Sequence, residues 1–239
     1  YSYRAPESFI DTNVKGTLNV LEGVRRFGVR RLVQTSTSEV YGTPAELPIR
    51  ETHPLRGQSP YSASKIAADK LCEAYHCSFG VPVVTLRPFN TYGPRQSRRA
   101  VLPTILTQLL AGRRVVRLGR LDPRRDLTFV SDTIEAFLRA GEAEGLEGDV
   151  IQLGTGQAAS IAELFEAACR VLAVEASVEQ DSERMRPDGS EVMVLISDPA
   201  KAKRVLGWEA AVSLEEGLSR TASWLAERPS GRDPGRYQV

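Results

Sequence analysis

Short apolar runs alternate with helical patterns along the first 160 residues of this chain. The runs within 30–36, 81–87 and 150–153 are short and rich in β-branched residues, which is typical of buried parallel strands. Apolar residues at helical spacing predict helices over 7–27 and 60–79 between them. This alternation predicts an α/β fold, a doubly wound parallel sheet with helices on both faces.

The rest of the chain is looser, and we expect it to form a smaller lobe over the carboxyl ends of the strands, where open α/β folds bind ligands. Residues 1–160 should hold the sheet with some insertions from the lobe, 161–226 the lobe itself, and 227–239 a disordered tail rich in Arg, Pro, Ser and Gly. Further helices are expected at 100–111, 131–139, 164–172, 199–206 and 214–225, short strands at 115–118 and 127–130, and irregular chain at 43–58, 88–95 and 119–126. Gly154–Gly156 is interpreted as a strand-end turn rather than a phosphate loop.

The helix at 60–79 begins with a chemically suggestive pair. Ser59 suits the N-cap and Pro60 the first helical position, so Tyr61 and Lys65 lie on one face, one turn apart. An ammonium there can lower the pKa of the phenol and turn Tyr61 into a proton carrier. Alone, a Tyr-x-x-x-Lys pair is common by chance and identifies no function.

Composition excludes several classes of partner. The net charge is +1, from 31 basic and 30 acidic residues, which gives no reason to expect nucleic acid. No run of 18 apolar residues occurs, so no membrane span is predicted. Cys72, Cys77 and Cys169 have neither metal-ligand spacing nor a disulfide pattern, which favours a reducing cytoplasm and predicts no metal.

Three motifs occur together in this chain: Thr35–Gly42, Tyr61–Lys65 and Arg87–Arg95. In order and spacing they resemble the extended short-chain dehydrogenases/reductases, the NAD-dependent epimerase/dehydratase family of nucleotide-sugar enzymes. Asp11–Thr17 resembles that family's helix after the fourth strand, and the likeness runs from Tyr1 to about Leu225. The resemblance implies a Rossmann-type sheet, a C-terminal substrate-binding lobe and NAD as the cofactor.

The family's Gly-x-x-Gly-x-x-Gly turn, which cradles the dinucleotide pyrophosphate, has no counterpart in this sequence. Gly141, Gly145 and Gly148 follow a helical pattern instead of a strand. The resemblance therefore implies that about the first third of the fold lies before Tyr1. On this reading the sheet is truncated at its N-terminus, and the chain by itself neither holds NAD nor is active.

The resemblance also assigns catalytic roles. Thr37 matches the hydroxyl that binds the sugar 4-OH, and Tyr61, beside Lys65, matches the base that takes its proton. Glu39 matches the carboxylate that removes the C5 proton in 4,6-dehydratases. Ser38 departs from the aspartate of dTDP-glucose 4,6-dehydratases and agrees with the Thr-Ser-Glu of GDP-mannose and UDP-N-acetylglucosamine 4,6-dehydratases, so the general acid is Ser38 or Glu39.

The remaining site residues follow in the same way. Ser36, Tyr61, Lys65 and Pro88 are expected to contact the cofactor, and Asn90, Arg95, Arg125 and Arg186 the nucleotide sugar, for whose diphosphate an arginine fork is well suited. A homodimer through the helices at 7–27 and 60–79 is also expected from the family.

The longer strings Ser59–Lys70 and Pro94–Ser97 resemble UDP-N-acetylglucosamine 4,6-dehydratases most, so a UDP-N-acetylhexosamine is the expected substrate. UDP-glucuronate decarboxylases share Thr-Ser-Glu-Val-Tyr-Gly and are the first alternative, with a 4-epimerase of the same family beside them. An inactive remnant or dimerisation scaffold is the alternative of another class. The nucleotide base depends on the shape of the regions 100–125 and 160–190, which the sequence leaves open.

Overall fold

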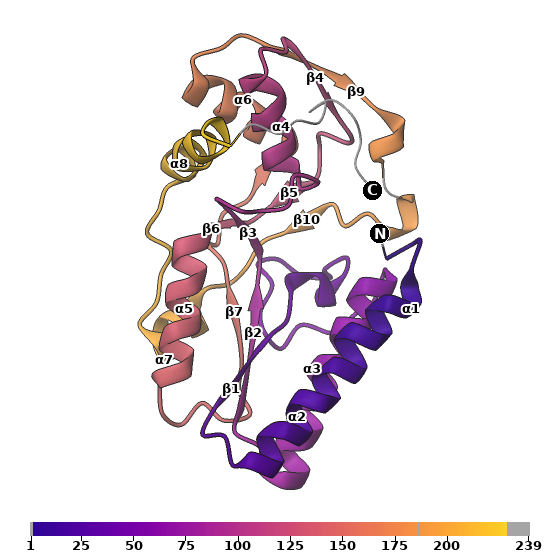
Figure 1. Cartoon of the computed structure of the whole chain (residues 1–239), viewed down its shortest axis with the longest axis vertical. Coiled ribbons are helices and arrows are strands. Elements are labelled where there is room, and N and C mark those ends of the chain that lie inside the picture. The colour runs from indigo at the N-terminus through magenta and orange to yellow at the C-terminus, as the bar shows by residue number, and fades with distance from the viewer. Residues whose placement is uncertain (1, 186, 229–239) are drawn as a thin grey trace.

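The computed structural model describes residues 2–185 and 187–228. The molecule is elongated, with a helix-flanked sheet at one end and a helical lobe at the other (Figure 1). Residues 229–239 of the predicted tail lie outside the described residues, as does Arg186. Among the helices described, none has the length and apolar content that crossing a membrane requires.

The central sheet has three parallel strands in the order β1-β2-β7. These are β1 (Leu32–Thr35), β2 (Val83–Pro88) and β7 (Val150–Leu153). Strands β1 and β7 lie within runs predicted to be buried strands, and β2 extends one residue beyond its predicted run. The register pairs Leu32 with Val83 and Thr85 with Val150. Strand β2 is in the middle and is almost wholly buried, as predicted from the apolar residues Val83, Val84 and Leu86.

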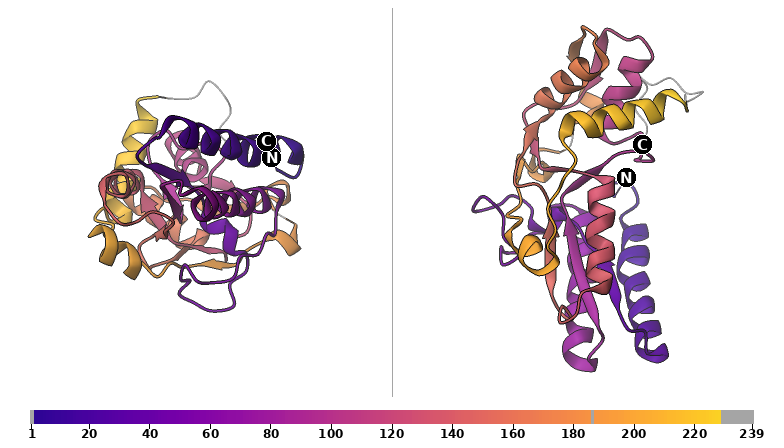
Figure 2. Two further views of the ribbon diagram at one scale, coloured as in Figure 1. Left: turned by 90° about the horizontal axis from the view of Figure 1, so that it is seen from below. Right: turned by 90° about the vertical axis from the view of Figure 1, so that its left-hand side faces the viewer.

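Helices cover both faces of this sheet, which confirms the doubly wound arrangement. On one face, α2 (Gly16–Phe27) and α3 (Pro60–Phe79) pack through Leu21 and Cys72 against Val83. On the other face lie α5 (Val130–Glu142) and α7 (Ala200–Leu206), where Trp208 is fully buried (Figures 1 and 2).

The helix predicted at 7–27 is one helix with an irregular segment inside it. It runs through α1 (Pro6–Phe9), a π-helical segment at Ile10–Lys15 and α2. Within that segment, Asn13 Nδ2 donates to Ser64 Oγ of α3 at 2.9 Å. Segments of π-helix are frequent at functional sites, and apolar spacing does not reveal them because they add a single residue to a turn.

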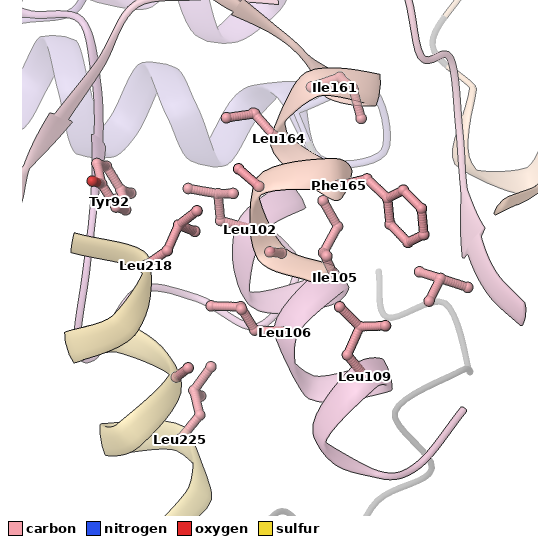
Figure 3. Packing of buried hydrophobic residues seen from close by; sticks show 14 of the residues in the cluster. Tyr92, Leu102, Ile105, Leu106, Leu109, Ile161, Leu164, Phe165, Leu218 and Leu225 are labelled. Atoms are coloured by element: carbon pink, nitrogen blue, oxygen red, sulfur yellow. The ribbon is translucent and has the colours of Figure 1, made fainter. Parts of the chain in front are cut away.

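The lobe at the other end has its own apolar core. It joins α4 (Val101–Leu110), α6 (Ile161–Leu172) and α8 (Leu214–Ala226), with Ile105, Leu164 and Leu218 among the buried residues (Figure 3). Beside these helices, β4 (Val115–Leu118) pairs in parallel with β9 (Ser177–Gln180).

Very short strands and 3-10 turns join the lobe to the sheet. Strand β3 (Asn90–Tyr92) pairs with β6 (Leu127–Phe129), and β5 (Arg124–Arg125) lies between β8 (Ala159–Ser160) and β10 (Val194–Leu195). The 3-10 turns are η2 (Ser38–Tyr41), η3 (Ser182–Arg184) and η4 (Asp188–Ser190). The expectation of irregular chain was wrong for β3 and β5, because strands of two or three residues depend on distant partners and carry no periodicity of their own.

The chain crosses between the two ends more than once. Helix α4 precedes residue 160 yet packs with α6 and α8, while α7 follows residue 160 and packs against the sheet. Residues 43–58 hold no helix or multi-residue strand and contact the β10 end through the bridge of Ile49 to Ser197 and the ion pair of Arg50 with Asp198. The sheet region and the lobe therefore each contain residues from before and after residue 160, and the division of the chain at this residue remains a prediction.

Candidate active site

The candidate catalytic turn, Thr37–Gly42, leaves the carboxyl end of β1. Thr37 is extended and caps the 3-10 turn, since its hydroxyl accepts a hydrogen bond from Glu39 N at 3.2 Å. Gly42 ends the turn with φ 60°, and a Cβ there would lie 2.5 Å from Arg56 O. Only glycine fits both the backbone angle and this close approach.

Helix α3 presents its first two turns to the catalytic turn. Ser59 caps the helix and Pro60 occupies the first position, as predicted, and Ser62 completes a reciprocal capping box with Ser59. Tyr61 follows, and its ring meets Phe9 edge-to-face at 5.8 Å between centroids. Ser64 Oγ donates to Tyr61 O at 2.7 Å, which ties the first turn to its own backbone.

The electrostatics of Tyr61 place it beside the catalytic turn. Burial raises the pKa of Tyr61, a hydrogen bond with the Thr37 hydroxyl lowers this pKa, and the negative charges of Glu39 and Asp69 raise it. Thr37, Glu39 and Tyr61 therefore share one environment at the carboxyl end of β1.

The expectation that Lys65 lowers the pKa of Tyr61 is wrong in this structure. Lys65 Nζ donates to Thr35 O, the last carbonyl of β1. Burial lowers the pKa of Lys65, and the negative charge of Asp69 raises it. The net direction for the Tyr61 pKa is upward because its desolvation outweighs the other influences.

The residues predicted to contact the cofactor gather at the carboxyl ends of β1 and β2. Ser36 follows β1 and is buried, Pro88 ends β2, and Lys65 and Tyr61 approach from α3. Hydroxyls, a phenol and an ammonium at this edge of a parallel sheet suit the ribose and carboxamide of a nicotinamide nucleotide. Ser38 lies within the catalytic turn and is 3% exposed, as is Ser36.

The residues predicted to bind substrate are distributed differently. Asn90 on β3 is half-buried, its N–H donates to Asp126 O at 3.0 Å, and its Oδ1 is buried without a hydrogen-bond partner. Arg125 on β5 is 8% exposed and forms an ion pair with Glu191 at 3.0 Å. Arg95 is exposed, with a left-handed backbone at φ 69°. The structure thus brings Asn90 and Arg125 onto adjacent segments, with Arg95 farther along the chain.

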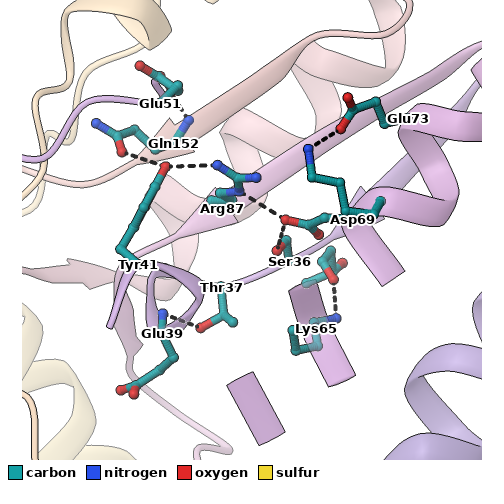
Figure 4. Close-up of polar contacts among 12 residues, drawn as sticks. Ser36, Thr37, Glu39, Tyr41, Glu51, Lys65, Asp69, Glu73, Arg87 and Gln152 are labelled. Atoms are coloured by element: carbon teal, nitrogen blue, oxygen red, sulfur yellow. Dashed lines mark hydrogen bonds and ion pairs between the residues drawn. The ribbon is translucent and has the colours of Figure 1, made fainter. Parts of the chain in front are cut away.

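Sequence reasoning missed a buried polar network around the catalytic turn. Asp69, Arg87 and Tyr41 are each at most 4% exposed, and hydrogen bonds connect them to Ser36 and Gln152 (Figure 4). One signal was available: Asp69 is four residues after Lys65, on the face that already carries Tyr61.

A second buried carboxylate, Asp126, explains the Gly154–Gly156 turn. Asp126 accepts hydrogen bonds from N and Oγ1 of Thr155, from Gly156 N, and from N and Oγ of Ser197, all between 2.6 and 3.1 Å. A Cβ at residue 154 would lie 2.3 Å from Ser197 Oγ. The turn's N–H groups thus bind the protein's own carboxylate, which confirms the interpretation as a strand-end turn.

Comparison with known proteins agrees with this architecture. The family model described as GDP-mannose 4,6-dehydratase matches residues 1–221. The chain is 35% identical to the dTDP-glucose 4,6-dehydratase of Xanthomonas campestris pv. campestris, over 93% of this chain and 68% of that protein. It is 34% identical to the UDP-glucose 4-epimerase of Mycolicibacterium smegmatis, over 90% and 69%, and 34% identical to UDP-glucuronic acid decarboxylase 1 of Arabidopsis thaliana, over 99% and 54%.

Solved structures give the same result. RMD from Pseudomonas aeruginosa, complexed with NADPH, superposes with a TM-score of 0.87 at 29% identity, covering 95% of this chain and 77% of that one. The dTDP-glucose 4,6-dehydratase of Bacillus anthracis str. Ames, in complex with NAD, has a TM-score of 0.82 at 30% identity, covering 92% and 69%. These nicotinamide complexes agree with the cofactor predicted from the motifs. The chain therefore belongs to the NAD-dependent epimerase/dehydratase family, the extended short-chain dehydrogenases/reductases.

Proposed function

We propose that this protein is an NAD-dependent nucleotide-sugar 4,6-dehydratase acting on a UDP-N-acetylhexosamine. The observation that carries the proposal is the shared environment of Thr37, Glu39 and Tyr61, in which a hydroxyl touches the phenol and a carboxylate acts on its pKa. A 4,6-dehydration removes two protons from neighbouring positions of one sugar, the 4-OH and C5. A phenol and a carboxylate facing one space supply a base for each.

The chain's own residues then divide the work as follows. Thr37 binds the sugar 4-OH, and Tyr61 removes its proton, while Lys65 contacts the cofactor. Ser36, Tyr61, Lys65 and Pro88 would hold NAD, which when bound would supply the hydride chemistry at C4 and C6. Glu39 removes the C5 proton, made acidic by the C4 ketone, and passes a proton to the C6 hydroxyl as it leaves as water. A proton returns to C5 when C6 receives the hydride, and Tyr61 releases the proton it took from the 4-OH, so that the net change is the loss of one water. The product is a 4-keto-6-deoxy sugar.

Glu39 is the better proton carrier than Ser38 on the burial of the two side chains. Ser38 is 3% exposed, whereas Glu39 is only partly buried on the same turn. A carboxylate that accepts the C5 proton is also able to donate it, while a buried hydroxyl needs a further base. In this proposal Ser38 is a structural residue of the turn and does not carry the proton.

The nucleotide end of the substrate is assigned to the β3–β5 side. Asn90 has an unpartnered buried oxygen and Arg125 provides a guanidinium held by Glu191, so both offer polar groups on adjacent segments. We assign them, with Arg95 and Arg186, to the sugar diphosphate. The UDP-N-acetylhexosamine assignment depends on the likeness of Ser59–Lys70 and Pro94–Ser97 described above.

The direct test is incubation of the complete protein and NAD with UDP-, GDP- and dTDP-linked sugars, followed by mass spectrometry. Loss of one water from a UDP-N-acetylhexosamine is the expected result. Loss of carbon dioxide from UDP-glucuronate would instead identify a decarboxylase, and an isomer of unchanged mass a 4-epimerase. Binding without turnover of any sugar would favour the scaffold alternative.

Substitution of Glu39 separates the dehydratase from its relatives. In Glu39→Gln we expect water loss to fall about 10²- to 10⁴-fold, since the general base is gone, while the reduced-nicotinamide absorbance still develops. Glu39→Asp, which keeps a carboxylate, should recover part of the water loss. Full activity of Glu39→Gln would refute the role of Glu39.

We further propose a homodimer through the helices at 7–27 and 60–79. Ile10, Leu18 and Val20 are 44%, 37% and 49% exposed on the first of these helices, an unusual amount of apolar surface for a helix that faces water. Light scattering should give a dimer for the complete protein and a smaller species for Val20→Glu. A monomer in the unsubstituted protein would overturn this proposal.

A further inference from the structure

Arg87, a residue of β2, lies between helix α3 and the catalytic turn and contacts both. Its side chain, 4% exposed, rises from β2 beneath the turn Thr37–Gly42. Its Nε donates to Asp69 Oδ2 at 3.0 Å, and its Nη1 donates to Tyr41 Oη at 3.2 Å. One guanidinium thus contacts a carboxylate of α3 and a phenol of the turn.

These two contacts reach both ends of the catalytic turn. Before Thr37, the hydroxyl of Ser36 donates to the same oxygen of Asp69 at 2.8 Å. At the far end, Tyr41 donates onward to Gln152 Oε1 at 3.2 Å, and the guanidinium lies 5.2 Å from the Tyr41 ring centroid. Figure 4 shows this chain of contacts passing on one side of Thr37 and Glu39.

Stabilisation of the fold does not by itself account for a buried ion pair at this place. A buried ion pair costs desolvation that its mutual attraction barely repays, and apolar residues of similar volume often stabilise as well. A forked guanidinium, in contrast, fixes the relative geometry of two partners, because its donors have set directions. The two N–H groups of Arg87 that make these contacts donate to Asp69, which binds Ser36 before the turn, and to Tyr41 within the turn.

We propose that Arg87 is the positioning residue of the catalytic turn: through Asp69–Ser36 at one end and Tyr41 at the other, it holds Glu39 at the angle needed for proton removal at C5. This inference rests on the proposed dehydratase function. Thr37 is held independently of Tyr41, because it follows Ser36 directly and contacts Tyr61. The Tyr41 end therefore affects Glu39 more than it affects the Thr37–Tyr61 pair.

Tyr41→Phe tests this end of the network with the loss of one oxygen atom. We expect kcat for water loss to fall about tenfold with KM within a factor of two, since Glu39 is misaligned and the substrate contacts are kept. The single-turnover rate of reduced-nicotinamide formation should stay within a factor of two. A merely structural loosening would slow both steps together or raise KM.

Tyr92→Phe is the matched control, because Tyr92 is also buried, at 1% exposed, and its hydroxyl contacts backbone carbonyls in the lobe. It should leave the ratio of the two rates unchanged. Arg87→Lys keeps the positive charge near Asp69 but loses the fork, and should lower water loss about 100-fold while C4 oxidation falls less.

A second readout needs no turnover. Hydrogen exchange of the amides of Glu39–Gly42, measured without cofactor, should be about tenfold faster in Tyr41→Phe and in Arg87→Lys, and unchanged in Tyr92→Phe. Unchanged exchange in both variants, or equal slowing of both chemical steps, overturns the positioning role. If the unsubstituted protein dehydrates no sugar, the proposed function fails, and the exchange data alone then decide whether Arg87 holds the turn.

Discussion

Asp69 and Asp126 are both buried carboxylates, but their partners differ in charge and in position. Asp69 accepts from the guanidinium of Arg87 and the hydroxyl of Ser36, whereas Asp126 accepts five bonds from neutral donors of Thr155, Gly156 and Ser197. One Asp69 oxygen, Oδ1, is buried without a partner.

The two sites consequently do different things in the molecule. Asp69 contributes to the pKa values of Tyr61 and Lys65, so its charge reaches the candidate catalytic groups. Asp126 ties the turn after β7 and the segment after β10 to the end of β5, where the chain passes between the sheet and the lobe. The position of a buried carboxylate decides its effect: Asp69 lies near groups that titrate, whereas Asp126 lies among backbone donors that it fixes in place.

Removal of Asp126 should have the largest effect on folding. Asp126→Ala leaves the N–H groups of Thr155 and Ser197 without their acceptor and Gly156 N with only the Ser197 hydroxyl. At 1–3 kcal/mol for each unsatisfied group, we expect a loss of about 4 kcal/mol in the free energy of unfolding. Denaturant titration measures this loss, and Asp126→Asn, which keeps one acceptor, should lose less. A loss below about 1 kcal/mol would mean that water replaces the carboxylate at little cost.

The Arg87–Asp69 pair should show a smaller loss and strong coupling. Arg87→Leu leaves a buried carboxylate uncompensated, so we expect about 3 kcal/mol of destabilisation. The double variant Arg87→Leu with Asp69→Leu should be more stable than the sum of the two single losses predicts, by about 1–3 kcal/mol. Strict additivity would show that the two side chains do not act as a pair.

The electrostatic difference between the carboxylates is testable by titration. The negative charge of Asp69 raises the pKa of Tyr61 and of Lys65, so Asp69→Asn should lower both values. Ultraviolet difference titration against Tyr61→Phe reports the phenol, and NMR of labelled lysines reports Lys65. Asp126→Asn serves as the control and should shift neither; a shift of equal size there would remove the distinction.

Breaking an exposed ion pair should cause the smallest loss of stability among these substitutions. Arg139 and Glu135, four residues apart on α5, form an ion pair at 2.8 Å with side chains 40% and 51% exposed. Glu135→Gln should cost at most about 0.5 kcal/mol, and added salt should reduce this cost further. A loss comparable to that of Arg87→Leu would show that burial is not what makes the Asp69 pair costly to break.

Local signals in the sequence were sufficient for the scaffold of this fold. Ser59 with Pro60, and Ser160 with Glu163, begin helices through caps that involve only neighbouring residues, and the apolar run of β2 needs no partner to be recognised. The catalytic candidates Thr37, Glu39 and Tyr61 were identified through motif likeness, and their contacts with one another are a property of the folded chain.

What the sequence could not reveal depends on distant partners. Glu191 pairs with Arg125 across 66 positions, and Ser197 reaches Asp126 across 71. The direction of the Tyr61 pKa was mistaken because spacing gives the distance to Lys65 but says nothing of burial, the largest influence on that phenol.

The π-helical segment at Ile10–Lys15 makes the residue count of the first helix part of the active-site design. Each residue turns an α-helix by about 100°, so losing one residue from this segment would rotate Phe9 around the axis and away from Tyr61. A conservative substitution inside the segment keeps the orientation of Phe9 towards Tyr61, whereas deletion of one residue destroys it. Along this helix, the number of residues is therefore constrained more tightly than the chemical nature of their side chains.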